Sequence, residues 1–213
     1  MFKGIVFDVD GVLFNTEPLH VKAWRRIEEK YGFSFSDDFY TGWVGLPCAE
    51  LAEVIRAKAN LSVSGSELLR EKEKVFSKLL HTEEYSIPGT SEGLKQLSRK
   101  VPVAWATTSI RAHVEIMFAR AGITKYFSCG VCFEDVENKK PDPEAYLKAA
   151  AGLGVKPELC AGADDSPSGT KSASMAGLYT IGICSFFGKE SLPSADIHFA
   201  STAEAMKWLL DST

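Results

Sequence analysis

The sequence predicts an α/β protein, a doubly wound parallel sheet in three α/β/α layers with a small all-helical insertion after the first strand. From residue 84 onward, short β-branched and aromatic runs alternate with amphipathic stretches of about a dozen residues, as in right-handed βαβ units. Between the first strand and residue 83, the apolar residues have helical spacing and form no convincing strand. We therefore expect a core of residues 1–15 and 84–213 and a helical cap of residues 16–83.

The first strand is expected in "KGIVFDVD", a compact run of β-branched and aromatic residues suited to a buried strand. A helix follows over "PLHVKAWRRIEEKYG", with Thr16 as its expected N-cap, Pro18 in its first turn and Gly32 at its end. Two more helices are predicted in the insertion, over "CAELAEVIRAKAN" and "GSELLREKEKVFSKLLHTEE". The charge run at 70–74 is expected to form a solvated face of the second of these helices.

A strict alternation of helices and strands is expected after Pro88 and Gly89. The predicted helices are "SEGLKQLSRK", "AHVEIMFARAG", "PDPEAYLKAAAGLG", "SGTKSASMAG" and "TAEAMKWLL". The predicted strands are "VPVAWATTS", "YFSCGVCF", "ELCAGADD", "LYTIGIC" and "DIHFA".

The composition is that of an ordinary globular protein, with 45% hydrophobic and 24% charged residues among 213. A net charge of −4 gives no electrostatic footprint for nucleic acid or an anionic membrane. No apolar run approaches the ~20 residues that cross a bilayer, and the first residues lack the design of a secretory signal. Five scattered cysteines indicate reduced thiols and a cytoplasmic setting, with Cys129 and Cys132 as packing residues. No apolar surface stripe stands out, so a monomer is the default expectation.

Chemically reactive side chains follow four separate segments of the predicted core. In open α/β sheets, ligands bind at the carboxyl ends of the strands. If the sheet is parallel, these four groups converge at one edge. They are Asp8-Val9-Asp10-Gly11, Thr107-Thr108-Ser109, Lys139-Lys140-Pro141-Asp142-Pro143 and Asp164-Asp165.

The acids of these segments predict a magnesium site. Asp8 and Asp10 stand two residues apart on a strand, so they face the same way and each raises the pKa of the other. Something positive is therefore expected between them. With Asp164 and Asp165, up to four carboxylates meet, and a hard cation such as Mg²⁺ with oxygen ligands relieves their repulsion.

The remaining groups predict an anion with several oxygens. Backbone N–H groups at a strand-to-helix turn and the hydroxyls of the Thr107–Ser109 segment, Thr108 included, suit such an anion. Lys140 precedes Pro141, which fixes where its side chain leaves the loop. A metal, hydroxyls, a lysine and a free carboxylate together indicate phosphoryl transfer.

Each acid has an expected role in that chemistry. Asp8 is the predicted nucleophile, forming an aspartyl-phosphate. Asp10 is the predicted acid and base, and Gly11 lets the backbone approach the phosphate closely. The purely structural alternatives are a buried acid pair at Asp8 and Asp10, and a helix N-cap at Asp164 and Asp165. For Lys140 the alternative is an exposed loop residue.

Four motifs, "DVDGVLFNTE", "ATTS", "KKPDP" and "GADDS", resemble in order and spacing those of the haloacid dehalogenase-like hydrolase superfamily. The resemblance spans essentially the whole chain and is greatest to the branch with a helical cap that contains β-phosphoglucomutase and sugar-phosphate phosphatases. It implies a Rossmann-like core in which Asp8, the carbonyl of Asp10 and Asp165 hold Mg²⁺, while Thr107 and Lys140 bind the phosphoryl group. Asp164 stands where glutamate is common in this branch, and is expected to reach the metal only through water.

The resemblance also implies substrate-binding residues on the cap side. They are Glu17, His20, Trp24, Gly45 and Lys72. His20 and Lys72 would gate Asp10 by cap closure. The structural alternatives to these roles are a helix-surface position for His20, core packing for Trp24 and a solvated side chain for Lys72. Cys48 stands where the mutase has a cap arginine for the distal phosphate, and Ile110 where the mutase has a lysine.

Three functions follow from these observations. The preferred one is a Mg²⁺-dependent phosphatase acting on a small phosphorylated sugar or related metabolite, because the cap arginine is missing. The alternative is a β-phosphoglucomutase-like isomerase that returns the phosphoryl group to a sugar hydroxyl. The remote alternative is a receiver-type signalling module, which would carry the acid pair on the first strand and have no helical insertion.

Overall fold

The computed structural model describes residues 1–43 and 48–213. It divides into two compact units: a core unit of residues 1–15 and 86–213, and a cap unit of residues 16–85. The sequence placed the second boundary at 83/84, two residues earlier. Each unit is described separately below.

The core unit is built on a parallel sheet of six strands within the described residues, in the order β3-β2-β1-β4-β5-β6. The alternation of strands and helices predicts a doubly wound topology, and this strand order confirms it. The strands are β1 (Gly4–Phe7), β2 (Val103–Ala106), β3 (Cys129–Val131), β4 (Cys160–Asp164), β5 (Tyr179–Ile183) and β6 (Ile197–Phe199).

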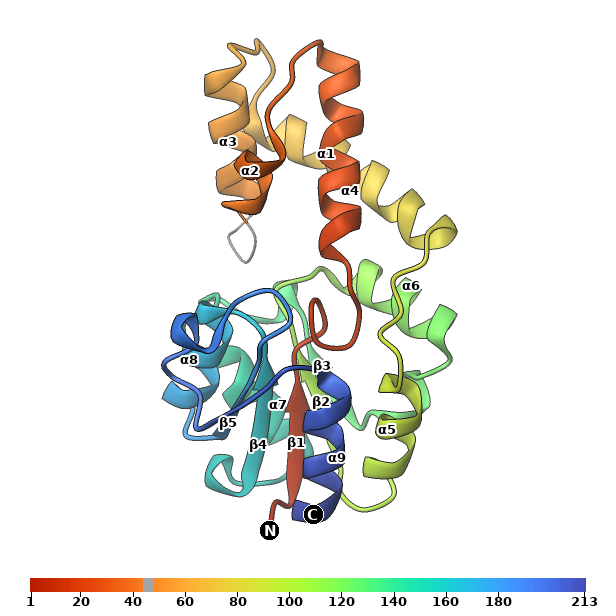
Figure 1. The fold of residues 1–213 in the computed structure, drawn as a ribbon, viewed down its shortest axis with the longest axis vertical. Coiled ribbons are helices and arrows are strands. Elements are labelled where there is room, and N and C mark those ends of the chain that lie inside the picture. The colour runs from red at the N-terminus through yellow and green to blue at the C-terminus, as the bar shows by residue number, and fades with distance from the viewer. Residues whose placement is uncertain (44–47) are drawn as a thin grey trace. The chain divides into compact units, whose positions relative to one another are not determined.

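Helices cover both faces of this sheet (Figure 1). They are α5 (Thr90–Leu97), α6 (Arg111–Ala121), α7 (Glu144–Leu153), α8 (Pro167–Met175) and α9 (Thr202–Ser212). Helix α7 packs on β1, β2 and β3, and α8 packs on β4 and β5. Helix α9 packs on β5 and β6 and against α5. Because both faces are covered, the central strand β1 is buried along its whole length, which explains its continuous apolar run.

Each face of the sheet has its own side-chain layer. Val6 of β1 packs with alanines and Tyr146 of α7 on one face. On the other, the Trp105 ring of β2 meets the Phe118 ring of α6 edge-on, with centroids 4.9 Å apart. Successive residues of a strand point to opposite faces, so one strand serves both layers.

The regular secondary structure in the described part of the cap unit consists of helices. Its helices are α1 (Glu17–Tyr31), α2 (Asp37–Thr41), α3 (Cys48–Lys58) and α4 (Gly65–Thr82). Helix α1 packs on α4, and α4 on α3, around a core centred on Trp24, Ile55 and Leu68. Gly32 ends α1 in the left-handed conformation, with φ 73°, as its position predicts.

Two details of the cap unit differ from the sequence predictions. Thr16 occupies the N-cap position of α1, but its backbone is helical and its side chain makes no capping hydrogen bond. A hydroxyl reaches the N–H groups of the first turn from an extended N-cap backbone, so the helical backbone removes this role. The run at 70–74 is not wholly solvated either, because Lys72 is fully buried.

Candidate active site

Asp8 lies immediately after β1, at the carboxyl edge of the core sheet. Its side chain is buried, and its Oδ1 accepts a hydrogen bond from Lys140 Nζ at 2.7 Å. Burial raises the pKa of Asp8 to about 8, opposed by the charge of Lys140 and reinforced by the carboxylates of Asp164 and Asp10. Lys140 by itself therefore does not keep Asp8 ionised at neutral pH. A second positive charge beside Asp8 would favour the ionised nucleophile.

Asp10 is held by the hydroxyl residues at the end of β2. Its Oδ2 accepts from Ser109 Oγ at 2.7 Å and from Thr107 Oγ1 at 3.4 Å. Thr107 Oγ1 also accepts from the Ser109 backbone N–H at 3.0 Å, which fixes both side chains. The hydroxyls expected to face an anion thus face Asp10 in this structure, while Thr108 is exposed.

Lys140 is a buried residue, with its side chain 4% exposed, so the exposed-loop alternative is wrong. Its ammonium donates to Asp8 Oδ1 at 2.7 Å, to the Ala106 carbonyl at 2.9 Å and to Asp164 Oδ2 at 2.8 Å. Burial alone would lower the pKa of Lys140, but the Asp164 and Asp8 carboxylates raise it well above its usual range. Lys140 therefore remains charged. The Lys140–Pro141 peptide bond is cis.

Asp164 ends β4, and Asp165 is the next residue. The helix α8 that follows is capped by Ser166, whose Oγ accepts from the Gly169 N–H at 3.0 Å. The N-cap alternative for the two aspartates is therefore wrong, because Ser166 occupies that role.

The acids at this edge form a compact oxygen cluster. One carboxylate oxygen from each of Asp8, Asp164 and Asp165 lies within 4.8 Å of the others. Asp165 also packs on Gly11, where a Cβ atom would stand only 1.9 Å from Asp165 Oδ2. A set of carboxylate oxygens with a glycine backbone alongside fits a hard divalent cation such as Mg²⁺. The donor chemistry therefore agrees with the predicted metal.

Sequence reasoning missed two residues of this cluster. The Tyr146 hydroxyl donates to Asp164 Oδ2 at 2.7 Å. The Ser185 hydroxyl lies 3.4 Å from Asp165 Oδ2 and 3.4 Å from the Gly11 carbonyl. Ser185 follows β5, so the strand-end rule applied to a fifth strand would have found it. The sequence signal for Tyr146 was weaker. A tyrosine on an otherwise apolar helix face is expected to be buried, and its hydroxyl then needs a hydrogen-bond partner.

The cap unit contains a second polar cluster, around Lys72 of α4. Lys72 Nζ lies 2.6 Å from His20 Nδ1, 2.9 Å from Glu73 Oε1 and 3.6 Å from Cys48 Sγ. The His20 ring stacks on Phe76, with centroids 3.9 Å apart. Burial raises the pKa of the Cys48 thiol despite the nearby Lys72, so the sulfur remains protonated. His20 and Lys72 are thus brought together, and the solvated alternative for Lys72 is wrong.

The other predicted cap residues lie elsewhere. Trp24 is buried in the cap core, and its indole Nε1 has no hydrogen-bond partner among residues 1–43 and 48–213. Glu17 is the first residue of α1. Gly45 lies outside the described residues.

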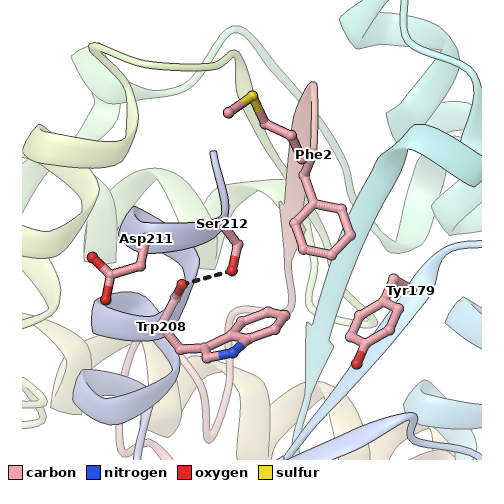
Figure 2. A pocket seen from close by; sticks show the side chains of 6 residues that line it. Phe2, Tyr179, Trp208, Asp211 and Ser212 are labelled. Carbon is pink, nitrogen blue, oxygen red and sulfur yellow. Dashed lines mark hydrogen bonds between the residues drawn. The ribbon is translucent and has the colours of Figure 1, made fainter.

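A separate hollow of about 340 Å³ lies at the opposite edge of the core sheet, where the strands begin (Figure 2). Phe2, Tyr179 and Trp208 line it, with ring centroids 5.3 to 5.9 Å apart. The other residues that line the hollow are Met1, Ser212 and Asp211, which is the one acid among them. This hollow does not share the chemistry of the carboxylate cluster.

The family model of the haloacid dehalogenase-like hydrolases matches residues 5–183. The chain belongs to this family. The membership predicted from the four motifs is confirmed, and the matched span contains all four of these motifs. The expectation of an enzyme is confirmed with it.

Relatives of this family member share most of their length with it. A phosphorylated carbohydrates phosphatase of Thermotoga maritima is 35% identical over 184 residues, covering 84% of this chain and 83% of the relative. A β-phosphoglucomutase of Bacillus subtilis is 29% identical over 189 residues, covering 85% and 83%. The crystal structure of a putative β-phosphoglucomutase from Thermotoga maritima matches with a TM-score of 0.80 and 30% identity, covering 99% of this chain and all of the other.

The described helices contain none that is both long and apolar enough to span a bilayer.

Proposed function

We propose that this family member is a Mg²⁺-dependent phosphatase that hydrolyses a small phosphorylated sugar through an aspartyl-phosphate on Asp8. The observation that carries the proposal is the Lys140 ammonium, which bridges Asp8 and Asp164 beside Asp165. This arrangement supplies a nucleophile, a fixed positive charge and a site for a cation within one cluster. Phosphoryl transfer needs these groups, because positioning and charge neutralisation provide most of its catalysis.

In the first step, the Asp8 carboxylate attacks phosphorus. Oδ1 is engaged by Lys140, so Oδ2 is the oxygen that forms the new O–P bond. The bond between phosphorus and the ester oxygen breaks, and the leaving alkoxide takes a proton from Asp10. Ser109 and Thr107 hold the Asp10 carboxyl in place for that transfer.

In the second step, water attacks the phosphorus of the aspartyl-phosphate. Asp10, now ionised, accepts the proton of the water, and the O–P bond to Asp8 breaks. Inorganic phosphate leaves, and both aspartates return to their starting protonation states. Lys140 stays charged throughout and neutralises the phosphoryl oxygens.

Asp8, Asp165 and the Asp10 carbonyl are the residues that would hold Mg²⁺. When bound, the cation would supply positive charge that favours ionised Asp8 and screens the phosphoryl oxygens. Gly11 keeps space for the Asp165 carboxylate at this position.

The substrate class is inferred from the relatives. The Thermotoga protein acts, by its name, on phosphorylated carbohydrates, and it shares 35% of the aligned residues. A fructose-1-phosphate phosphatase of Escherichia coli is 29% identical over 85% of this chain. A small sugar phosphate is therefore the substrate class that we propose.

The second candidate is a β-phosphoglucomutase-like isomerase, favoured by the Bacillus subtilis relative. It uses the same first half-reaction but passes the phosphoryl group to a sugar hydroxyl. We prefer hydrolysis because Cys48, and not an arginine, begins α3. Its thiol is protonated and cannot neutralise a second phosphate.

One assay separates the two candidates. The protein is incubated with Mg²⁺, β-glucose 1-phosphate and a trace of the glucose bisphosphate, beside a panel of single sugar phosphates. Release of inorganic phosphate is the expected result. Predominant glucose 6-phosphate would instead establish the mutase.

The covalent mechanism is tested by Asp8→Asn. An amide cannot attack phosphorus, so kcat is expected to fall by at least about 10³-fold. The matched control is Asp211→Asn, which makes the same change to the acid at the rim of the opposite hollow and should retain full activity. Activity surviving in Asp8→Asn would refute the aspartyl-phosphate.

A further inference from the structure

The carboxylate of Asp164 has every hydrogen-bonding position filled. Oδ1 accepts from the Ser166 N–H at 2.9 Å and from Ser166 Oγ at 2.8 Å. Oδ2 accepts from Lys140 Nζ at 2.8 Å and from the Tyr146 hydroxyl at 2.7 Å. An ionised carboxylate has about four acceptor positions, so direct binding of a cation would require Asp164 to give up one of these bonds. The hydrogen bonds of Asp164 therefore suit a residue that anchors Lys140.

The Lys140 ammonium is equally saturated. An ammonium has three N–H donors, and here the three acceptors come from the ends of three strands: Asp8 after β1, the Ala106 carbonyl of β2 and Asp164 of β4. The ring of Tyr146 lies beneath the ammonium, 4.9 Å from Nζ to the ring centroid. The direction of the Lys140 side chain is therefore set by all four groups together.

Tyr146 touches both members of this pair. It lies on α7, fully buried, with its hydroxyl on Asp164 and its ring face towards Lys140. Burial and the adjacent Asp164 carboxylate raise the pKa of Tyr146 well above its usual range, so the phenol keeps its proton and remains a donor. Without that donor, one acceptor position of Asp164 Oδ2 would be buried and unsatisfied.

We propose that Tyr146 is a positioning residue for the reaction: through Asp164 it fixes the Lys140 ammonium against Asp8, where the phosphoryl group is transferred. The inference rests on the proposed phosphatase function, because only there does the direction of Lys140 affect a rate. In this proposal Asp164 orients the Lys140 ammonium, while its neighbour Asp165 is a ligand of the cation.

The first test is Tyr146→Phe, assayed with p-nitrophenyl phosphate and Mg²⁺. Lys140 would keep its charge but lose its fixed direction, so kcat is expected to fall about tenfold, with KM within about twofold. The matched control is Tyr85→Phe, which removes a buried phenol that donates to the Leu80 carbonyl in the cap unit. It should change kcat less than twofold. An unchanged kcat in Tyr146→Phe would overturn the proposal.

A double-mutant cycle tests whether Tyr146 acts through Lys140. In a Lys140→Met background, Tyr146→Phe should reduce kcat no further, because the residue that it positions is absent. A second tenfold loss in that background would show an independent structural effect and would overturn the proposal.

The adjacent aspartates provide a second pair of variants, useful also if Tyr146→Phe does not fold. Mg²⁺ binding is measured by calorimetry without substrate. Asp164→Asn should retain Mg²⁺ affinity within about threefold and lose activity, whereas Asp165→Asn should lose at least about tenfold in affinity. An equal loss of affinity in both variants would make Asp164 a metal ligand and overturn the proposal.

One readout is independent of turnover. In a ¹⁵N spectrum of the lysine side chains, the buried ammonium of Lys140 should give a resolved signal, assigned by its absence in Lys140→Met. This signal should shift or broaden in Tyr146→Phe and not in Tyr85→Phe, and an unchanged signal would refute the positioning role. A wild-type protein that hydrolyses no substrate of the panel would contradict the phosphatase function alone, and the spectrum would still decide the role of Tyr146.

Discussion

Gly11 is the residue whose identity the site depends on most directly. Its φ of 74° lies in the left-handed region, where a side chain is disfavoured. A Cβ atom would also stand 1.9 Å from Asp165 Oδ2 and 2.5 Å from its Cγ. The carboxylate could not stay where it is, so the glycine reserves space for the proposed metal ligand.

We predict that Gly11→Ala reduces both kcat and Mg²⁺ affinity by at least about tenfold, because the methyl group displaces Asp165. The control is Gly122→Ala, at φ 66° with no atom within 4 Å of the added Cβ. Both variants should lose about 1 kcal/mol of stability from the strained backbone. Steady-state kinetics and calorimetry should separate them, and full activity in Gly11→Ala would contradict the assigned role of Asp165.

Residue-level prediction from the sequence was more complete for residues near the strand ends of the core than for the helices of the cap. Asp8 and Asp164 could be predicted to converge because both stand at the carboxyl ends of parallel strands. Lys140 could be predicted to join them because its loop lies at the same edge of the sheet. Lys72 left two possibilities open, although it sits four residues after Leu68 and four before Phe76, on the buried stripe of α4. The helical period predicts that the side chain of Lys72 is buried, and only its charge favours a solvent-exposed position.

At the scale of elements, the first turn of α7 anchors the loop that carries Lys140. The Glu144 carboxylate accepts from the backbone N–H groups of Glu137 and Asn138, and from the Asn138 side chain. It also pairs with Lys148 one turn later at 2.6 Å. One side chain thus ties the loop to the helix, and these hydrogen bonds favour its ionised form.

Glu144 should therefore contribute to acid stability. The hydrogen bond from Lys148 and those from the Asn138 and Glu137 backbones lower the pKa of Glu144 from 4.5 to about 2. A lowered native pKa stabilises the fold above pH 4.5, and this contribution is lost as the pH falls towards 2. Glu144→Gln should flatten the loss of stability in that window, measured by urea unfolding at a series of pH values. Glu115→Gln, at an exposed position of α6, is the control and should follow the wild-type curve.

Periodicity predicted the regular elements better than the connections between them. The alternation of apolar runs located the strands of the sheet within a few residues, because the inner strands are buried and the two edge strands, β3 and β6, are half-buried. The five-residue helix α2 was not predicted, since it is shorter than the window in which a helical period can be recognised. The position of Tyr146 beneath Lys140 depends on how α7 packs on β1, which no local pattern encodes.

At the scale of the whole molecule, the two units have separate apolar cores. The cap core is supported by a buried acid, Glu28, which is 5% exposed. Its Oε1 accepts from the Phe35 N–H at 2.7 Å and from the Tyr40 hydroxyl at 2.9 Å, while Oε2 accepts from Arg25 at 2.7 Å. All these partners belong to the cap unit, so the acid joins α1 to the segment containing α2.

We predict that Glu28→Gln destabilises the cap unit selectively. An amide can replace only some of these bonds, and the cost of leaving buried partners unsatisfied is about 2 kcal/mol. Hydrogen exchange should therefore accelerate in the described part of residues 16–85, while amides of β1, β2 and β4 keep their wild-type rates, because separate cores open as separate units. The adjacent control is Glu29→Gln, because Glu29 is an exposed acid paired with Arg26. This variant should change the exchange rates of neither unit. Faster exchange in the core strands of Glu28→Gln would show that the two units unfold together.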